Sequence, residues 1–308
     1  MIRYLEHKAI DKTKWDALIA ECGNIYARSW YLDVVHPDWE ALVEDDYQAV
    51  MPLTGGKKFG IRYLFQPFFV QQLGVFSTTS PTPEKTEAFL NAIPQKYRFA
   101  EIRLNESNTL SEGYKGIEYH RNVLLDLSQD YESIQANYHQ NTKRNLAKAE
   151  SHNLQLVNTV IPYHVVALFR DNRGASLDKW GDAEYTRLTR LAQSAINRNS
   201  AFILGVSEIG VGQLLCAAIF MKTDDRITFL FSGLSEDGKQ KQAMTWLLDQ
   251  VIKKHAKQPV TFDFEGSDDD NLARFYLGFG GTETQYPSFM FNRLSPVGKA
   301  LLKVWKKR

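Results

Sequence analysis

The sequence contains little cysteine and no excess of either charge. Only two of its 308 residues are cysteines, Cys22 and Cys216, and they stand far apart. This usage is typical of a reducing compartment and argues against a disulfide framework. The 37 basic and 36 acidic residues leave a net charge of +1. No global field would therefore recruit nucleic acid or a membrane surface, and any anion site must be local.

Apolar runs long enough to cross a bilayer are also missing. The longest candidate, Leu214–Met221, is the size of a strand, whereas a spanning helix needs about 20 apolar residues. The N-terminal residues MIRYLEHKAIDKTKW have no apolar signal core. We therefore expect no membrane span and a cytoplasmic protein.

Several catalytic signatures are absent as well. The seven histidines are scattered, and no pair has the His-Glu-x-x-His spacing of a zinc site. No Gly-x-Ser-x-Gly elbow, Walker loop or dinucleotide-binding fingerprint occurs. We expect no metal cofactor.

What is present is the composition of a globular α/β protein. Hydrophobic residues make up 44% and charged residues 24% of the chain, both ordinary for a protein with a real core, and the length suggests two domains. The order strand, strand, helix, strand, strand runs from Tyr47 to Leu127 and again from Gln213 to Asn292. This predicts two copies of one α/β topology with mixed sheets.

The predicted boundary lies at Leu127–Asp130, which divides the chain into domains 1–127 and 128–308. Ser128 or Asp130 can cap one long helix from Tyr131 to Glu150. The basic amphipathic segment 295–308 is expected to form a helix that packs back on the first domain.

Three further helix starts can be read from the sequence. Thr82 is a cap followed by Pro83 in the first turn, and Ser267 caps a helix that follows residues 261–266. After Gly238 an amphipathic helix is predicted. Its apolar face consists of Ala243, Met244, Leu247, Leu248, Val251 and Ile252.

Two segments of the second half carry a family resemblance. Residues 231–254, FSGLSEDGKQKQAMTWLLDQVIKK, and 261–281, TFDFEGSDDDNLARFYLGFGG, resemble the FemABX-like and related GNAT-fold proteins. Upstream, NTKRNLAKAE (141–150) resembles the basic helix that opens the second domain in this family. SWYLDVV (29–35) resembles a segment of the first domain.

The resemblance implies tandem GNAT-like domains, that is, the acyl-CoA N-acyltransferase fold with a mixed sheet. It also implies transfer of an acyl or aminoacyl group to an amine of a small molecule or peptide. The donors it implies are acyl-CoA and aminoacyl-tRNA, although the overall charge does not favour tRNA. A binding protein that keeps the fold without catalysis is the alternative of a different class.

The resemblance places a cofactor-binding loop before the long helix of the second half. In GNAT enzymes its backbone N–H groups and the helix N-terminus hold a pyrophosphate. The matching segment here is Leu234–Ala243, LSEDGKQKQA, in which only Gly238 of the pattern is kept, followed by Lys239 and Gln240. Because Glu236 and Asp237 stand at the same helix start and would repel a diphosphate, an ordinary capped helix is the competing interpretation.

Candidate catalytic residues follow in the next strand and helix. Asp263 and Glu265 alternate on one strand, so both side chains share a face, and either could serve as general base toward an amine. Tyr276 lies where GNAT enzymes often place a general-acid tyrosine. A buried or solvated acid, and a tyrosine packed in the core, are the structural alternatives.

Candidate residues for binding a substrate or an anion occur in both halves. Lys143 and Arg144 form a local basic face, bordered by Tyr138, and an arginine suits a bidentate grip on phosphate or carboxylate. A solvated helix face is the alternative. In the first half, the polar residues Gln71 and Gln72 interrupt an apolar strand and Trp30 could stack on a ligand. Pairing with loops and core packing are the alternatives there.

Overall fold

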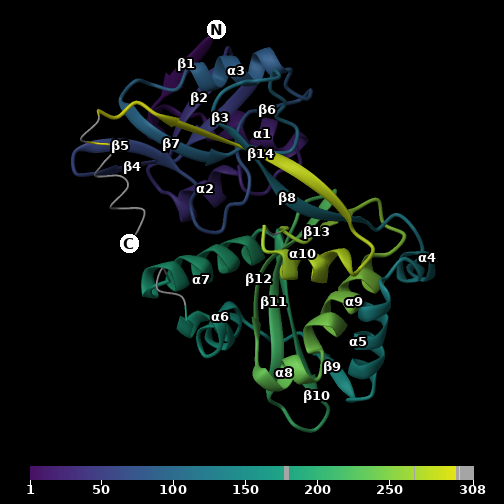
Figure 1. Cartoon of the computed structure of the whole chain (residues 1–308). Coiled ribbons are helices and arrows are strands. Elements are labelled where there is room, and N and C mark those ends of the chain that lie inside the picture. Colours follow the sequence, from purple (N-terminus) through teal and green to yellow (C-terminus); the bar gives the residue numbers. More distant parts are fainter. Residues whose placement is uncertain (177–179, 267, 296–297, 299–308) are drawn as a thin grey trace. The chain divides into compact units, whose positions relative to one another are not determined.

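The computed structural model describes residues 1–176, 180–266, 268–295 and 298 (Figure 1). The chain divides into two compact units, described separately below. Unit 1 comprises Met1–His120 and the segment from Gln285 onward, and unit 2 comprises Arg121–Thr284. The boundary falls within two strands, β8 (Ile117–Asp126) and β14 (Thr282–Asn292). Most of the predicted helix 295–308 lies outside the described residues.

Unit 1 contains an antiparallel sheet in the order β1-β2-β3-β6, and a second group in which β4 pairs with β5 and β5 runs parallel to β7. The C-terminal part of β14, Ser288–Asn292, pairs with β7. The elements of unit 1 are β1 (Ile2–Leu5), a 3-10 turn (His7–Ala9), α1 (Lys12–Glu21), α2 (Ser29–Val35), β2 (Glu40–Glu44), β3 (Ala49–Leu53), β4 (Gly55–Lys58), β5 (Ile61–Phe65), β6 (Phe76–Ser77), α3 (Pro83–Asn91) and β7 (Tyr97–Arg103).

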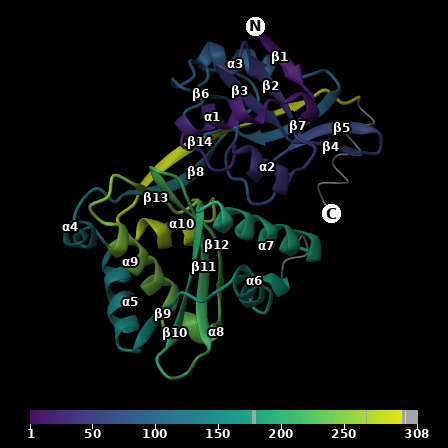
Figure 2. The same cartoon turned by 180° about the vertical axis from the view of Figure 1, so that it is seen from behind.

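Unit 2 is built on a mixed sheet in the order β8-β13-β12-β11-β10-β9. Its strands are antiparallel, except that β12 and β13 are parallel. Helices α5 and α9 cover one face of this sheet, and α6 and α7 cover the other (Figures 1 and 2). The remaining elements are α4 (Tyr131–Ala136), α5 (Gln140–Glu150), β9 (Leu154–Val157), α6 (Pro162–Arg170), a 3-10 turn (Arg173–Ser176), α7 (Asp182–Asn197), β10 (Ala201–Glu208), β11 (Leu214–Lys222), β12 (Arg226–Leu234), α8 (Glu236–Gln240), α9 (Ala243–His255), β13 (Thr261–Asp263) and α10 (Asp270–Leu277).

The predicted single helix over residues 131–150 is wrong, because the structure breaks it into α4 and α5. The backbone N–H of His139 donates to the carbonyl of Gly278 at 2.9 Å instead of to its own helix. Gly280, at φ +76°, brings its backbone close to Asn137, where a Cβ would lie 3.1 Å from the Asn137 Cβ. This tertiary contact with the end of α10 interrupts a sequence that is locally helical.

Two helices begin with the capping residue that the sequence predicts, and a third begins with a different cap. Thr82 caps α3 by accepting from the Lys85 N–H, and Asp130 caps α4 by accepting from the Ser133 N–H. The cap of α10 is Asp269, whose carboxylate accepts from the N–H groups of residues 271 and 272. The expected cap Ser267 lies outside the described residues.

A buried carboxylate joins α9 to the chain around α4. Asp249 accepts hydrogen bonds from the hydroxyls of Tyr131 at 2.8 Å and Tyr138 at 3.2 Å, and it is 1% exposed. Burial raises the pKa of Asp249 above the ordinary aspartate value, although the two tyrosine hydrogen bonds act in the opposite direction. Tyr138, a candidate binding residue, is thus a partner of this carboxylate.

We expect Asp249→Asn to change how stability depends on pH. Because the folded-state pKa of Asp249 is raised, its contribution to stability is fully present below the unfolded-state pKa of about 4 and is lost as pH rises through the folded-state pKa. The variant does not titrate at this position. The stability of Asp249→Asn relative to the natural chain should therefore increase as pH rises above about 4.

Urea unfolding of both proteins across this pH range measures the difference. Glu132→Gln, which removes an exposed acid of α4, is the matched control and should show a much flatter difference. A constant difference between Asp249→Asn and the natural chain at all pH values would contradict the prediction.

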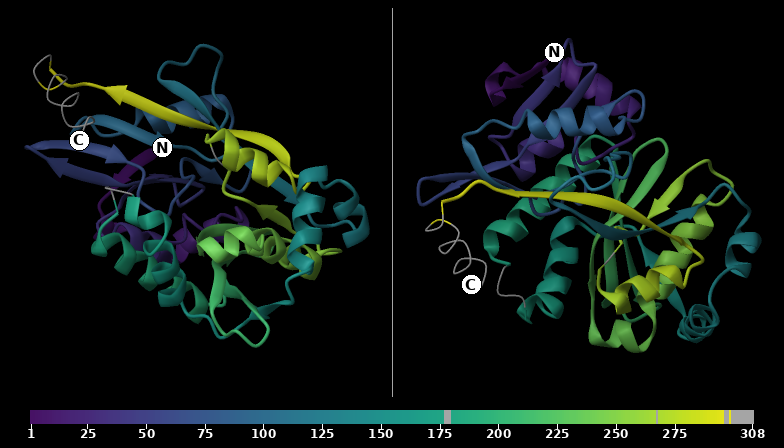
Figure 3. Two further views of the ribbon diagram at one scale, coloured as in Figure 1. Left: turned by 60° about the horizontal axis from the view of Figure 1, so that its bottom comes forward. Right: turned by 45° about the horizontal axis from the view of Figure 1, so that its top comes forward.

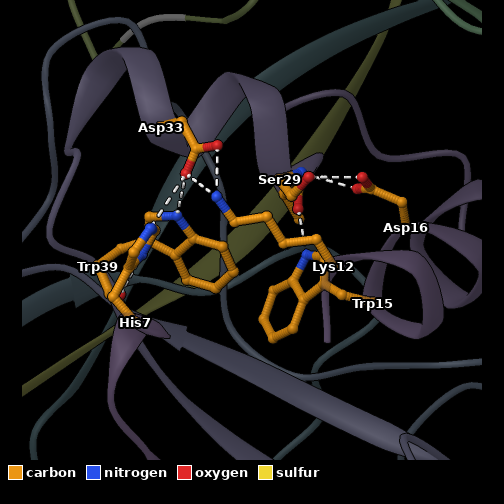
Figure 4. Close-up of polar contacts among 8 residues, drawn as sticks. His7, Lys12, Trp15, Asp16, Ser29, Asp33 and Trp39 are labelled. Atoms are coloured by element: carbon orange, nitrogen blue, oxygen red, sulfur yellow. Dashed lines mark hydrogen bonds and ion pairs between the residues drawn. The ribbon is translucent and has the colours of Figure 1, made fainter. Parts of the chain in front are cut away.

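In unit 1 a polar network joins the N-terminal turn to α1 and α2 (Figure 4). Asp33 accepts from Lys12 Nζ, at 2.7 and 2.9 Å, and from Trp39 Nε1 at 3.0 Å. His7 Nε2 lies 3.7 Å from the same carboxylate. These contacts fix helix α2, the SWYLDVV segment, onto its neighbours.

Candidate functional site

A cavity of about 990 Å³ lies within unit 2 where β12 and β13 separate. The two parallel strands pair only over Arg226–Thr228 and Thr261–Asp263. Beyond these pairs, the rest of β12 and the residues after β13 line the space between them. The lining residues are Phe169, Asn172, Arg173, Phe229, Leu230, Phe231, Ser232, Leu234, Glu236, Gly238, Lys239, Gln242, Met244, Thr245, Phe264, Glu265, Leu272, Phe275 and Tyr276.

Aromatic side chains form part of the cavity wall. Phe169 of α6 packs on Phe231 of β12 with ring centroids 4.6 Å apart. Tyr276 of α10 stacks on Phe264 at 5.1 Å and lies 5.7 Å from the Phe275 ring. Beside these rings, the charged groups that line the cavity are Arg173, Glu236, Lys239 and Glu265.

A β-bulge in β12 lies at the cavity. Ile219 of β11 pairs with Phe231, and the next residue, Phe220, pairs with Phe229. Leu230 is therefore the extra residue of the bulge. Because bulges redirect the local backbone and often occur beside active sites, the backbone around Leu230 is a candidate source of hydrogen bonds to a ligand.

Of the two candidate acids, Glu265 lines the cavity and Asp263 is not among its described lining residues. Asp263 is 1% exposed and its Oδ2 accepts from Arg226 Nη1 at 2.9 Å. Its Oδ1 accepts from the backbone N–H of Glu265 at 2.8 Å. Asp263 therefore holds the turn that carries Glu265.

The backbone at Glu265 is unusual. Its φ of +53° lies in the left-handed region, which a non-glycine residue adopts at an energetic cost. The next residue, Gly266, is pressed against β8, because a Cβ there would lie 2.3 Å from the Asn122 Cα. This close approach and the Asp263 hydrogen bond together hold the turn in place.

Tyr276 shares the cavity with Glu265. Burial raises the pKa of its hydroxyl well above the ordinary tyrosine value, the charge of Glu265 raises it further, and Arg173 opposes the shift. The phenol is therefore protonated at neutral pH and can donate a hydrogen bond or a proton. No described residue is hydrogen-bonded to this hydroxyl.

The predicted cofactor loop is only partly at the cavity. Gly238 and Lys239 line it, whereas Gln240 is not among the described lining residues. The Gly238 N–H donates to Ser235 Oγ at 3.0 Å, and Lys239 Nζ pairs with Glu236 at 2.9 Å. A Cβ at Gly238 would lie 2.2 Å from the Leu215 carbonyl oxygen, so close packing on β11 requires this glycine.

The segment matched to the cofactor loop, Leu234–Ala243, ends at the first residue of α9, and sequence reasoning missed the next two residues, Met244 and Thr245, as part of the site. Gln242 precedes the helix in a left-handed conformation, φ +57°, and neither its side chain nor an acid in the first turn satisfies the N–H groups there. Met244 and Thr245 of this turn line the cavity. The left-handed residue leaves no clear sequence signal, because glutamine rarely adopts that conformation.

Arg173, which also lines the cavity, was missed as well. It begins a 3-10 turn after α6, more than 90 residues before Glu265 in the sequence. Nothing in its local sequence distinguishes it from a surface arginine.

The candidate binding residues on α5 have partners of their own. Lys143 Nζ donates to the carbonyl of Ala136, the last residue of α4, at 2.7 Å, and Arg144 donates to Asn141. Neither is among the described residues that line the cavity. Binding by Lys143 and Arg144 stays a prediction.

The candidate residues of unit 1 are likewise engaged. Gln72 Nε2 donates to Gln71 Oε1 at 2.8 Å, and Gln72 Oε1 accepts from the Glu106 N–H at 3.0 Å. Both glutamines are buried. Trp30 on α2 lies beside Tyr31, with ring centroids 5.5 Å apart. Ligand binding by these three residues also stays a prediction.

Within the described ranges, no group of three or more histidine, cysteine, aspartate or glutamate residues could hold a metal ion. No helix in the described part of the chain combines the length and the apolar character needed to cross a membrane.

Solved structures share this fold over nearly the whole chain. FemX superposes with a TM-score of 0.67 at 10% identity, covering 92% of this chain and 97% of FemX. L-PGS from Bacillus licheniformis has a TM-score of 0.53 at 12% identity, covering 97% of each chain. A tandem GNAT protein from the clavulanic acid biosynthesis pathway has a TM-score of 0.51 at 14% identity, covering 96% of this chain and 99% of that one.

At these identities the likeness shows the fold alone. The chain has a mixed α/β, GNAT-like fold of the FemABX type, and this confirms the fold predicted from the sequence. The fold is acyltransferase-like. No protein-family model matches the sequence, and no curated protein matches it.

Proposed function

We propose that unit 2 catalyses transfer of an activated acyl or aminoacyl group to an amine. The observation that carries the proposal is the shared cavity of Glu265 and Tyr276, beside the β12 bulge at Leu230. A carboxylate that can accept a proton, a phenol that can donate one and a redirected backbone in one cavity suit acyl transfer to an amine. The acyltransferase-like fold supports the same chemistry.

Each part has a role in the reaction. The amine nitrogen attacks the carbonyl carbon of the donor, forming a C–N bond, and Glu265 accepts the proton that the nitrogen loses. The backbone N–H groups at the bulge stabilise the negative charge on the carbonyl oxygen. As the bond to sulfur or oxygen breaks, the leaving group takes the proton of Tyr276. Holding both substrates in one cavity supplies much of the remaining rate enhancement.

The donor is an activated acyl ester, which is a thioester in acyl-CoA and an oxygen ester in aminoacyl-tRNA. The first turn of α9 offers backbone N–H groups near the cavity, which suit a phosphate or a carbonyl oxygen of either donor. Glu236 pairs with Lys239, which lowers the positive charge available to a diphosphate. The acceptor is the amine of a small molecule or peptide.

Transfer assays with the full chain distinguish the donors. Labelled acetyl-CoA and a labelled aminoacyl-tRNA are each incubated with the protein and a panel of amines, including a polyamine and a lysine-containing peptide. Mass spectrometry then detects the new amide. Product from one donor that depends on Glu265 supports the proposal. A lack of product from both donors contradicts it and favours a binding protein that keeps the fold without catalysis.

We expect Tyr276→Phe to lower kcat about 100-fold with little change in melting temperature, because the ring and its stacking on Phe264 are kept. The leaving group then lacks its proton donor. Since the pKa of Tyr276 is raised, the natural enzyme should show no alkaline loss of kcat near the ordinary tyrosine pKa of about 10. The measurement is kcat against pH for both proteins.

The control for this variant is Phe275→Leu, which alters the neighbouring wall without removing a proton donor. It should affect KM more than kcat. An unchanged kcat in Tyr276→Phe would exclude Tyr276 as the acid.

A further inference from the structure

The hairpin formed by β4 and β5 at the edge of unit 1 has an unexpected residue at its tip (blue strands in Figure 3). Lys58 pairs with Ile61, so the turn consists of Phe59 and Gly60. Both are left-handed, with φ of +51° and +79°. Such two-residue turns strongly favour Asn-Gly or Gly-Gly, because bulky side chains are strained at positive φ.

Phe59 is unfavourable for the isolated fold in two ways. Its backbone is held in a left-handed conformation that is strained for a bulky residue. The residue is also 82% exposed to solvent. Burial in the core therefore does not explain its presence. Lysines on an edge strand have an ordinary explanation, since they prevent pairing with other strands, but that explanation does not extend to the phenylalanine.

The residues beside Phe59 are cationic. Lys57, Lys58 and Arg62 are exposed, and the segment Gly55–Phe65 contains no acidic residue. Lys58 Nζ lies 5.8 Å from the centre of the Phe59 ring. The hairpin thus combines an exposed aromatic tip with a local positive charge, although the whole chain has a net charge of only +1.

We propose that this hairpin docks unit 1 onto an anionic lipid surface. The ring of Phe59 enters the interface between headgroups and acyl chains, and Lys57, Lys58 and Arg62 contact the anionic headgroups. A lipid interface fits better than RNA because the ring lies on a turn and not on a strand face, where bases usually stack. The tip residues Phe59 and Gly60 also offer no side-chain hydrogen bonds to a base edge.

Another hairpin of the same chain provides a matched control. The tip between β10 and β11 exposes Ile209 at 62% and Val211 at 59%. Residues 207–213 include Glu208 and no lysine or arginine, and Glu208 is paired with Lys241 at 2.6 Å. This tip is similarly apolar, and its neighbour Lys241 is already paired with Glu208 and Asp237.

The test is co-sedimentation of the full chain with vesicles. Vesicles of phosphatidylcholine mixed with phosphatidylglycerol should bind the protein, and added salt should weaken binding. Phe59→Asn should reduce the affinity about tenfold, and its melting temperature should be equal or higher because asparagine tolerates positive φ. The double variant Lys57→Gln/Lys58→Gln should reduce it about 25-fold, since each cation contributes about fivefold.

Ile209→Asn is the control and should bind vesicles like the natural chain. An equal loss of binding in this control would contradict the proposal, because any exposed apolar tip would then suffice. Binding unaffected by Phe59→Asn, equal binding to pure phosphatidylcholine, or no binding would overturn it. A single-stranded RNA bound more tightly than the vesicles, with loss in Phe59→Asn, would assign the hairpin to nucleic acid instead.

Discussion

Glu265→Gln is expected to reduce the rate of acyl transfer about 1,000-fold while leaving the KM for the donor nearly unchanged. Glutamine has almost the same size and shape as glutamate, so the cavity and the turn held by Asp263 are preserved. Its amide cannot accept the proton that the attacking amine must lose. The measurement is kcat and KM with the donor that supports transfer, together with the melting temperature.

The matched control for Glu265→Gln is Glu236→Gln. Glu236 also lines the cavity, but it is exposed and paired with Lys239. Its loss should change kcat by less than about fivefold, because a surface ion pair contributes at most about 1 kcal/mol. Equal losses in both variants would indicate a general electrostatic effect, and an unchanged rate in Glu265→Gln would remove Glu265 from the mechanism.

Arg226→Met is expected to lower the free energy of unfolding by about 3 kcal/mol, the lower end for breaking a buried ion pair. The Asp263 side chain is 2% exposed and that of Arg226 is 27% exposed. Methionine fills similar space but leaves the Asp263 carboxylate without its arginine partner. Urea unfolding of the full chain measures the loss.

Two further variants separate the charge from the packing. Arg226→Met combined with Asp263→Asn should recover much of the lost stability, because no uncompensated charge remains buried. Asp263→Asn alone should weaken the hold on the Glu265 backbone and lower kcat as well. A loss below about 1 kcal/mol in Arg226→Met would show that other groups compensate Asp263.

Local chemistry predicted several elements well. Thr82 and Pro83 begin α3 as expected, and the apolar face predicted after Gly238 is the buried face of α9. Capping and helical periodicity depend on residues within one or two turns, so they can be read directly from the sequence. The helix over residues 131–150 failed because Gly278 and Gly280, more than 120 residues away, determine where it breaks.

The candidate site also depends on tertiary contacts that the local sequence does not reveal. The prediction that Asp263 and Glu265 alternate on one strand and share a face is wrong, because β13 ends at Asp263 and Glu265 lies in a left-handed turn beyond it. Asp263 is buried in an ion pair with Arg226, whereas Glu265 stands in a left-handed turn and lines the cavity. Arg173 joins the site only through folding, because no spacing in the sequence links it to Glu265.

The sequence by itself predicted the mixed α/β elements through local caps and helix faces, and its resemblance to FemABX-like proteins predicted the GNAT-like fold. Only the tertiary structure decided where β12 and β13 separate, which acid lines the resulting cavity, and that Tyr276 shares it. The physical reason is that a cavity forms between segments distant in sequence, and burial and charge at each of its side chains depend on all of them together.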